Sequence, residues 1–244
     1  MQSLCGSMNP KWTLVTGASS DIGLETIKLL LKKNELVWGI YKSNFSNLES
    51  LNKQYPNNLF LSKYDFLQLD ELNSYINKIK KFKHSVKSFI SLASLRNTVD
   101  YGEISISDLM EHYTVNTIPL VLTIQELGNT MSDNGYGRIV IGSSIGIKFG
   151  GSNNSFCYSL TKLASEILPK ISKNWVASNV LSNVVRIGVT NTSSMRSEDL
   201  TLRSNLIPIK RPANPIEIAS FLVWLGSNEN TYISHQIIPI SGGE

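Results

Sequence analysis

The chain has 244 residues and a mass of 27.1 kDa, with hydrophobic residues at 41% and charged residues at 17%. This length and balance fit one globular domain with a large apolar core, and they exclude a small disulfide-stapled scaffold and a disordered chain. The net charge of +4 comes from 23 basic and 19 acidic residues, and the basic residues are scattered along the chain, so no nucleic-acid-binding surface is expected.

Short apolar runs alternate with amphipathic stretches from Lys11 onward, which is typical of strand–helix–strand units around a parallel sheet. The expected strands cover residues 12–15, 36–41, 59–64, 87–93, 137–142, 179–186 and 236–241. The main expected helices cover residues 24–33, 107–127, 155–175 and 216–226. The sequence therefore predicts a doubly wound α/β fold in which helices cover both faces of a seven-stranded parallel sheet.

The region from Thr190 to Asn214 is the least regular part of this pattern, and it directly follows an expected strand. A stretch of that length in a compact domain is more often a functional lid than a plain connection. We therefore expect a substrate lid at about residues 190–214. Residues 1–10 are interpreted as a short extension, and residues 11–244 as a single domain.

The two cysteines and three histidines of the chain show no spacing typical of a zinc or iron–sulfur site, so no metal is expected. The sequence also lacks a run of about eighteen apolar residues and a basic leader followed by an apolar stretch. These features predict a protein that does not enter a membrane and that works in the reducing cytoplasm.

A glycine-rich turn joins the first expected strand to the first expected helix. Such a turn presents backbone N–H groups and the positive end of a helix dipole to a pyrophosphate. The turn alone is also compatible with an ordinary strand-to-helix connection. Its candidate cofactor contacts are Gly17, Ser19, Ser20, Asp21, Ile22 and Gly23.

The end of the second expected strand bears on which dinucleotide binds. An acidic residue there accepts from the ribose 2′-hydroxyl of NAD, whereas positive charge suits the 2′-phosphate of NADP. Lys42 and Ser43 follow this strand and no acid is present, so NADP(H) is favoured and NAD(H) is possible. A lysine that is merely solvated is the alternative for Lys42.

A phenol and an ammonium group, those of Tyr158 and Lys162, lie four positions apart on one face of an expected helix. A lysine charge about 5 Å from a phenol favours the phenolate by roughly 3 kcal/mol at an effective dielectric constant near 20. That is most of what is required to bring a tyrosine pKa to neutrality, so we expect Lys162 to lower the pKa of Tyr158. Such a pair can donate a proton to a carbonyl or accept one from an alcohol.

A hydroxyl at the end of the preceding buried strand can hydrogen-bond a substrate oxygen in this constellation. Ser143 and Ser144 both lie there. Together, the glycine turn, the serine, the tyrosine and the lysine resemble the short-chain dehydrogenase/reductase family, and the likeness covers nearly the whole chain. Its C-terminal part is similar to 3-oxoacyl-carrier-protein reductase-like members. The second serine of the family's turn matches Ser144, and Asn116 matches a helix asparagine that supports a proton relay.

The resemblance implies a Rossmann-type fold, and it assigns catalytic roles to Asn116, Ser144, Tyr158 and Lys162. It places Asp65 and Phe66 near the adenine. The cofactor contacts that it implies beyond the glycine turn are Asp65, Phe66, Ser91, Ala93, Tyr158, Lys162, Gly188, Thr190 and Thr192.

The resemblance further implies a homotetramer or dimer that reduces a ketone or 3-oxo group of a small molecule with NADPH. NAD-linked alcohol oxidation by the same residues is one alternative. A nucleotide-binding scaffold without turnover is another, because the family's middle glycine is replaced by Asp21 and its two asparagines by Ser91 and Leu92, while Pro169 lies inside an expected helix. The sequence does not choose between a sugar, an acyl thioester and a small ketone as substrate.

Overall fold

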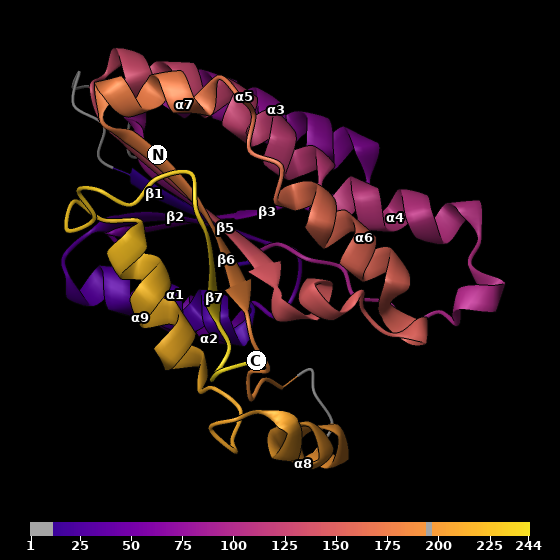
Figure 1. The fold of residues 1–244 in the computed structure, drawn as a ribbon. Coiled ribbons are helices and arrows are strands. Elements are labelled where there is room, and N and C mark those ends of the chain that lie inside the picture. Colours follow the sequence, from indigo (N-terminus) through magenta and orange to yellow (C-terminus); the bar gives the residue numbers. More distant parts are fainter. Residues whose placement is uncertain (1–11, 194–196) are drawn as a thin grey trace.

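Seven parallel strands form one sheet at the centre of the molecule (Figure 1). The computed structural model describes residues 12–193 and 197–244, so the expected extension at residues 1–10 lies outside the described chain. The sheet order is β3-β2-β1-β4-β5-β6-β7, which confirms the predicted doubly wound parallel sheet. The strands are β1 (Trp12–Thr16), β2 (Leu36–Tyr41), β3 (Leu59–Lys63), β4 (Val86–Ser91), β5 (Gly137–Ser144), β6 (Val180–Ile187) and β7 (Ile237–Ile240).

Helices cover both faces of the sheet (Figure 1). The α-helices of the described chain are α1 (Asp21–Lys32), α2 (Ser46–Gln54), α3 (Leu69–Phe82), α4 (Ile106–Asn116), α5 (Ile118–Asp133), α6 (Phe156–Ser165), α7 (Ser172–Trp175), α8 (Ser197–Leu206) and α9 (Pro215–Leu225). One layer holds α1, α2 and α9, and the other holds α3 to α7. None of the helices in the described ranges has both the length and the apolar character needed to span a membrane.

Successive side chains of the central strands enter two separate apolar cores. In β1, Leu14 joins the core beneath α3 and α5, whereas Val15 joins the core beneath α1 and α9. Ile139 and Val140 of β5 divide in the same way. Strands that are buried on both faces read as nearly continuous apolar runs, which explains why the sequence pattern located them.

Two of the expected helices are each divided in the structure. Residues 107–127 are spread over α4 and α5, which meet at Thr117, and Pro119 lies in the first turn of α5, where its missing N–H costs little. Residues 155–175 are spread over α6 and the short α7, with Pro169 between them. Residues 107–127 are helical as expected, apart from the break at Thr117, whereas the prediction of a single helix over residues 155–175 is wrong. The helix α6 ends at Ser165, and Pro169 prevents it from continuing through Leu168.

The expected lid at residues 190–214 is not a plain loop, because it contains α8 (Figure 1). An isolated parallel bridge joins Thr190 to Ala213, so the two ends of this segment meet. Residues 194–196 of the segment lie outside the described chain.

One buried cation ties the amino ends of β5 and β6 to the end of α9. Arg138 is 2% exposed, and burial lowers its pKa. Its guanidinium donates to the carbonyls of Gly137, Asn179, Ser227 and Asn230 at 2.7–3.1 Å. A single side chain therefore satisfies acceptors from separate elements.

Replacement of this cation, Arg138→Met, is expected to lower the free energy of unfolding by about 3 kcal/mol or more, because buried carbonyls lose their donors together. Urea denaturation measures the change. Lys53→Met is the control, since Lys53 is three-quarters exposed in a surface pair with Glu49 and is expected to shift stability by less than about 0.5 kcal/mol. Equal losses in the two variants would contradict the structural role of Arg138.

Candidate active site

A cavity of about 850 Å³ lies at the carboxyl edge of the sheet. Segments that follow each of the strands β1 to β6 line it. Ligands of open α/β sheets bind at this edge, where the strand order reverses beside β1. The predicted site residues that line it are Gly17, Ser19, Ser20, Asp21, Ile22, Lys42, Ser43, Asp65, Phe66, Ala93, Ser144, Tyr158, Lys162, Gly188, Thr190 and Thr192.

The other predicted site residues, Gly23, Ser91 and Asn116, do not line this cavity. A Cβ at Gly23 would lie 2.1 Å from the Gly17 carbonyl oxygen, so Gly23 serves the close packing of the turn. Ser91 is buried in β4. The buried Asn116 amide accepts from the Leu95 N–H at 2.6 Å and donates to the Leu95 carbonyl at 3.0 Å, so it fixes the segment after β4.

The glycine turn has the geometry that a pyrophosphate needs. Gly17 adopts a φ of +71°, and a Cβ there would lie 2.6 Å from the backbone of Leu92. The Ser20 side chain caps α1 by accepting from the Gly23 N–H at 3.1 Å. Asp21 and Ile22, the first two residues of α1, line the cavity, and their N–H groups precede the first intrahelical hydrogen bond, so the turn fits a dinucleotide phosphate.

The carboxylate of Asp21 binds the segment that follows β6. Its Oδ2 accepts from the backbone N–H and from the hydroxyl of Ser193, each at 2.8 Å. A carboxylate is also favoured electrostatically in the first turn of a helix. The negative charge is thus engaged by Ser193, and it links the glycine turn to the lid segment.

Lys42, after β2, and Asp65, after β3, form an ion pair at the wall of the cavity. The Lys42 Nζ lies 3.1 Å from the Asp65 Oδ2, and the two side chains are 54% and 23% exposed. The sequence placed these residues at separate parts of a cofactor, whereas the structure makes them partners. A phosphate that binds Lys42 therefore shares the Lys42 ammonium with the Asp65 carboxylate.

The two serines at the end of β5 have different partners. The buried Ser143 hydroxyl donates to Glu166 at 2.8 Å, and Glu166 also accepts two hydrogen bonds from Arg186 at 2.8 and 2.7 Å. The Ser144 hydroxyl accepts from the Gly146 N–H at 3.2 Å and lies next to Tyr158. This arrangement leaves Ser144 as the hydroxyl for a substrate oxygen.

Burial dominates the protonation of the tyrosine and the lysine. It raises the pKa of Tyr158, against the opposing effect of the Ser144 hydroxyl. It also lowers the pKa of Lys162 to about 8, and the ammonium donates to the Gly142 carbonyl at 2.8 Å. The expectation that Lys162 brings the pKa of Tyr158 down to neutrality is corrected, because Lys162 is directed to the Gly142 carbonyl and burial outweighs the charges near the phenol.

Sequence reasoning missed two residues beside Tyr158. The Cζ of Arg96 lies 5.6 Å from the centroid of the Tyr158 ring. The charge of Arg96 and, to a smaller extent, the hydroxyl of Ser94 lower the pKa of Tyr158 against the effect of burial. Both residues follow β4, far from Tyr158 in the sequence, so no spacing pattern could have found them.

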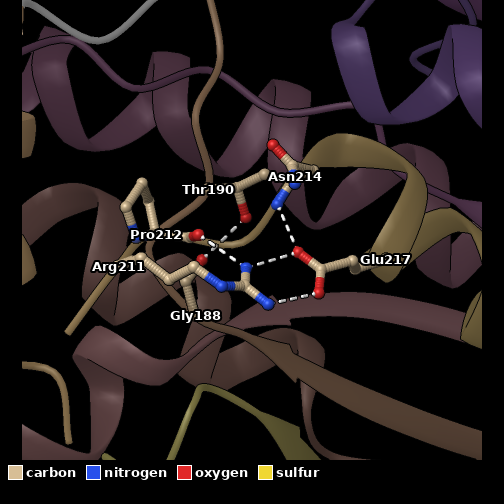
Figure 2. A network of polar contacts seen from close by, with 6 residues as sticks. All are labelled: Gly188, Thr190, Arg211, Pro212, Asn214 and Glu217. Carbon is tan, nitrogen blue, oxygen red and sulfur yellow. Dashed lines mark hydrogen bonds and ion pairs between the residues drawn. The ribbon is translucent and has the colours of Figure 1, made fainter. Parts of the chain in front are cut away.

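A polar network fixes the junction between β6 and α9 at the cavity (Figure 2). Arg211 donates two hydrogen bonds to Glu217 at 2.7 and 2.8 Å, and Glu217 accepts from the Asn214 N–H at 2.8 Å. The Thr190 hydroxyl donates to the Gly188 carbonyl at 3.0 Å. The bridge between Thr190 and Ala213 connects these two groups of contacts, so Gly188 and Thr190, which line the cavity, belong to a braced part of the chain.

A doubly wound sheet with a glycine turn and a cavity at its carboxyl edge defines the class of nucleotide-binding α/β proteins. Within that class, a family model described as short chain dehydrogenase matches residues 11–202. The chain belongs to this family, and it is an oxidoreductase of the NAD(P)-dependent dehydrogenase/reductase type.

Known relatives cover nearly the whole chain at low identity. The 3-oxoacyl-[acyl-carrier-protein] reductase MabA of Mycobacterium bovis is 24% identical over 94% of this chain and 91% of that protein. A short-chain dehydrogenase/reductase from Serratia marcescens has a TM-score of 0.85 at 22% identity, covering 98% of this chain and 99% of that chain. ElxO with NADP bound has a TM-score of 0.82 at 21% identity, covering 96% and 98%.

The buried ammonium of Lys162 has a measurable effect on stability. Because the pKa of about 8 in the folded state lies below the ordinary lysine value of 10.5, the unfolded chain binds more protons between these pH values, and stability rises with pH there. Below pH 8, burial of the charged Lys162 ammonium therefore lowers the free energy of unfolding by its full amount. We expect the free energy of unfolding of Lys162→Met to exceed that of wild type by up to roughly 3 kcal/mol at pH 7. This difference is expected to shrink toward pH 10.5.

Urea denaturation from pH 7 to 10.5 measures this difference, with Lys53→Met as a control that shows no such trend. A constant difference between wild type and Lys162→Met over this range would show that the ammonium carries no burial cost.

Proposed function

We propose that this chain reduces a ketone or 3-oxo group of a small molecule to a secondary alcohol, with NADPH as the reductant. The observation that carries the proposal is the meeting of Ser144, Tyr158 and Lys162 at one cavity that also contains the glycine turn. The likeness to a 3-oxoacyl-[acyl-carrier-protein] reductase and to a protein solved with NADP bound supports the reaction and the cofactor.

The three side chains have complementary roles in this reaction. When bound, the reduced nicotinamide supplies a hydride. Ser144 hydrogen-bonds the ketone oxygen, and the Tyr158 phenol donates a proton to that oxygen as negative charge develops on it. The ammonium of Lys162, whose Nζ lies 5.9 Å from the centroid of the Tyr158 ring, stabilises the phenolate that remains.

The protonation of Tyr158 suits the proton transfer in a reduction. Burial raises the pKa of Tyr158 and so favours the protonated phenol, the form that donates to a ketone. The same residues would catalyse the reverse alcohol oxidation through the phenolate.

The remaining cofactor contacts follow the same arrangement. We place the pyrophosphate at the glycine turn and the nicotinamide near Gly188, Thr190 and Thr192. Asn116 supports the proton relay by fixing the backbone of Leu95. Lys42 and Ser43 bind the 2′-phosphate, which competes with the Asp65 carboxylate for the Lys42 ammonium.

Loss of the phenol hydroxyl tests the enzymatic role. Tyr158→Phe is expected to lower kcat for a reducible ketone at least 100-fold, the usual scale for a lost general acid, with NADPH affinity changed by less than about threefold. Stopped-flow loss of NADPH absorbance and quenching of tryptophan fluorescence measure the two quantities. If wild type binds NADPH and reduces no member of a carbonyl panel, the nucleotide-binding scaffold becomes the better reading.

The choice of cofactor is tested at the ion pair. Lys42→Ala is expected to weaken NADPH binding about tenfold, or about 1.4 kcal/mol, and to leave NADH binding almost unchanged, because only the 2′-phosphate contacts Lys42. Asp65→Asn is the matched counterpart: it removes a competing anion and is expected to strengthen NADPH binding. Fluorescence titration gives both ratios, and equal losses for NADPH and NADH in Lys42→Ala would contradict the assignment.

The proposal includes a homo-oligomer, a dimer or a tetramer. Apolar side chains stay exposed in the chain on α4 to α6, among them Met110, Val121 and Leu163, and burial of these residues against a second copy would remove apolar surface from water. Sedimentation equilibrium is expected to give two or four times the chain mass of 27.1 kDa, and a species of single-chain mass would contradict it. The cytoplasmic location stays a prediction.

A further inference from the structure

The cavity carries positive charge beyond the lysine of the proposed mechanism. Arg96, from the segment after β4, and Arg203, from α8, both line it. The Arg96 guanidinium lies near the face of the Tyr158 ring, with its Cζ 5.6 Å from the centroid. Arg96 is exposed, so N–H donors beyond the ring contact remain open to a ligand.

The charges that line the cavity divide between its two ends. Among the lining residues of the described chain, the carboxylates are those of Asp21 and Asp65. Asp65 pairs with Lys42 and Asp21 binds Ser193, so both belong to the dinucleotide end. No ion pair found within the described residues includes Arg96.

The backbone next to Arg96 is fixed before any substrate arrives. Both polar backbone groups of Leu95 bond to the amide of Asn116, which is 3% exposed. The backbone that carries Arg96 is therefore held in place, so little backbone entropy is lost when its side chain binds a ligand. An anchored arginine without a carboxylate partner, beside the proposed proton donor, has the features of an anion-binding group.

We propose that Arg96 binds an oxyanion of the substrate, so that the ketones reduced here carry a carboxylate or a phosphate group a few bonds from the carbonyl. The guanidinium presents a fork of N–H donors that matches two oxygens of either group. Its closeness to Tyr158 places the anion and the carbonyl at the same end of the substrate. This inference rests on the proposed ketone reduction and names its substrate class.

The test compares charged and neutral ketones of similar shape with NADPH. Acetoacetate is paired with methyl acetoacetate, and dihydroxyacetone phosphate with dihydroxyacetone, so the two pairs separate a carboxylate from a phosphate. We expect wild type to show a kcat/KM at least tenfold higher for the charged member of one pair. Arg96→Gln is expected to reduce that ratio at least tenfold, and Arg96→Lys, which keeps a charge without the fork, is expected to be intermediate.

The ratio is the readout because loss of the Arg96 charge also acts on Tyr158, and that effect is common to both members of a pair. Lys53→Gln removes a positive charge outside the cavity and is the control that keeps the wild-type ratio. An unchanged ratio in Arg96→Gln, or equal rates for the charged and neutral ketones in wild type, would overturn the inference while the proposed function stands.

Binding to Tyr158→Phe loaded with NADPH, measured by calorimetry, gives a second readout that does not need turnover. Tighter binding of a charged probe that is lost in the double variant Tyr158→Phe/Arg96→Gln supports the anion site even where wild type reduces none of the four ketones. The proposed function is then decided separately, by the carbonyl panel. Equal or absent binding of charged and neutral probes, together with no charge preference in kcat/KM, overturns the anion site.

Discussion

All seven strands run in the same direction, so their carboxyl ends meet at one edge of the sheet and the chemistry of the molecule is confined there. Thr16 at the end of β1 lies opposite Ser91 of β4, and Ser91 lies opposite Ile141 of β5. A slip of one residue would move the side chains of a strand into the wrong core, because the central strands are buried on both faces. The burial that stabilises the sheet therefore also fixes the relative positions of the glycine turn, the segment after β4 and Ser144.

The same burial sets the protonation states at the site. Lys162 is 5% exposed and donates to the Gly142 carbonyl, so its charge is costly and its pKa falls to about 8. Tyr158 responds in the opposite sense, because burial disfavours its charged form and raises its pKa. Arg96 acts on the same ring from the more exposed side. The phenol thus lies between a buried cation and an exposed one, and a substrate anion that binds Arg96 would reduce the second influence.

The features that the sequence predicts well are those carried by contiguous residues. The strands follow from apolar runs that enter two cores, and the glycine turn follows from the segment between Thr16 and Gly23. The prediction of a single helix over residues 155–175 is wrong because it followed the apolar pattern and gave too little weight to Pro169, which interrupts the helix. Contacts between segments that follow different strands, such as that of Arg96 with Tyr158, require the sheet order and its register. Residue spacing along a helix places Tyr158 and Lys162 on one face, but it cannot reveal that the Gly142 carbonyl competes for the ammonium.

Two departures from the family pattern, the missing asparagines and Asp21, are compensated by neighbouring groups, which argues against a scaffold with a disabled site. Where the family has asparagines, the Thr16 hydroxyl accepts from the N–H groups of Leu92 and Ala93 at 3.3 Å each, so the centre of the sheet stays braced. Although Leu92 replaces an asparagine, its backbone still packs closely against Gly17. Asp21 in place of a glycine adds a charge, but Ser193 accommodates it with two hydrogen bonds. That contact therefore joins the glycine turn to the segment that follows β6, so the substituted position takes part in holding the two sides of the cavity together.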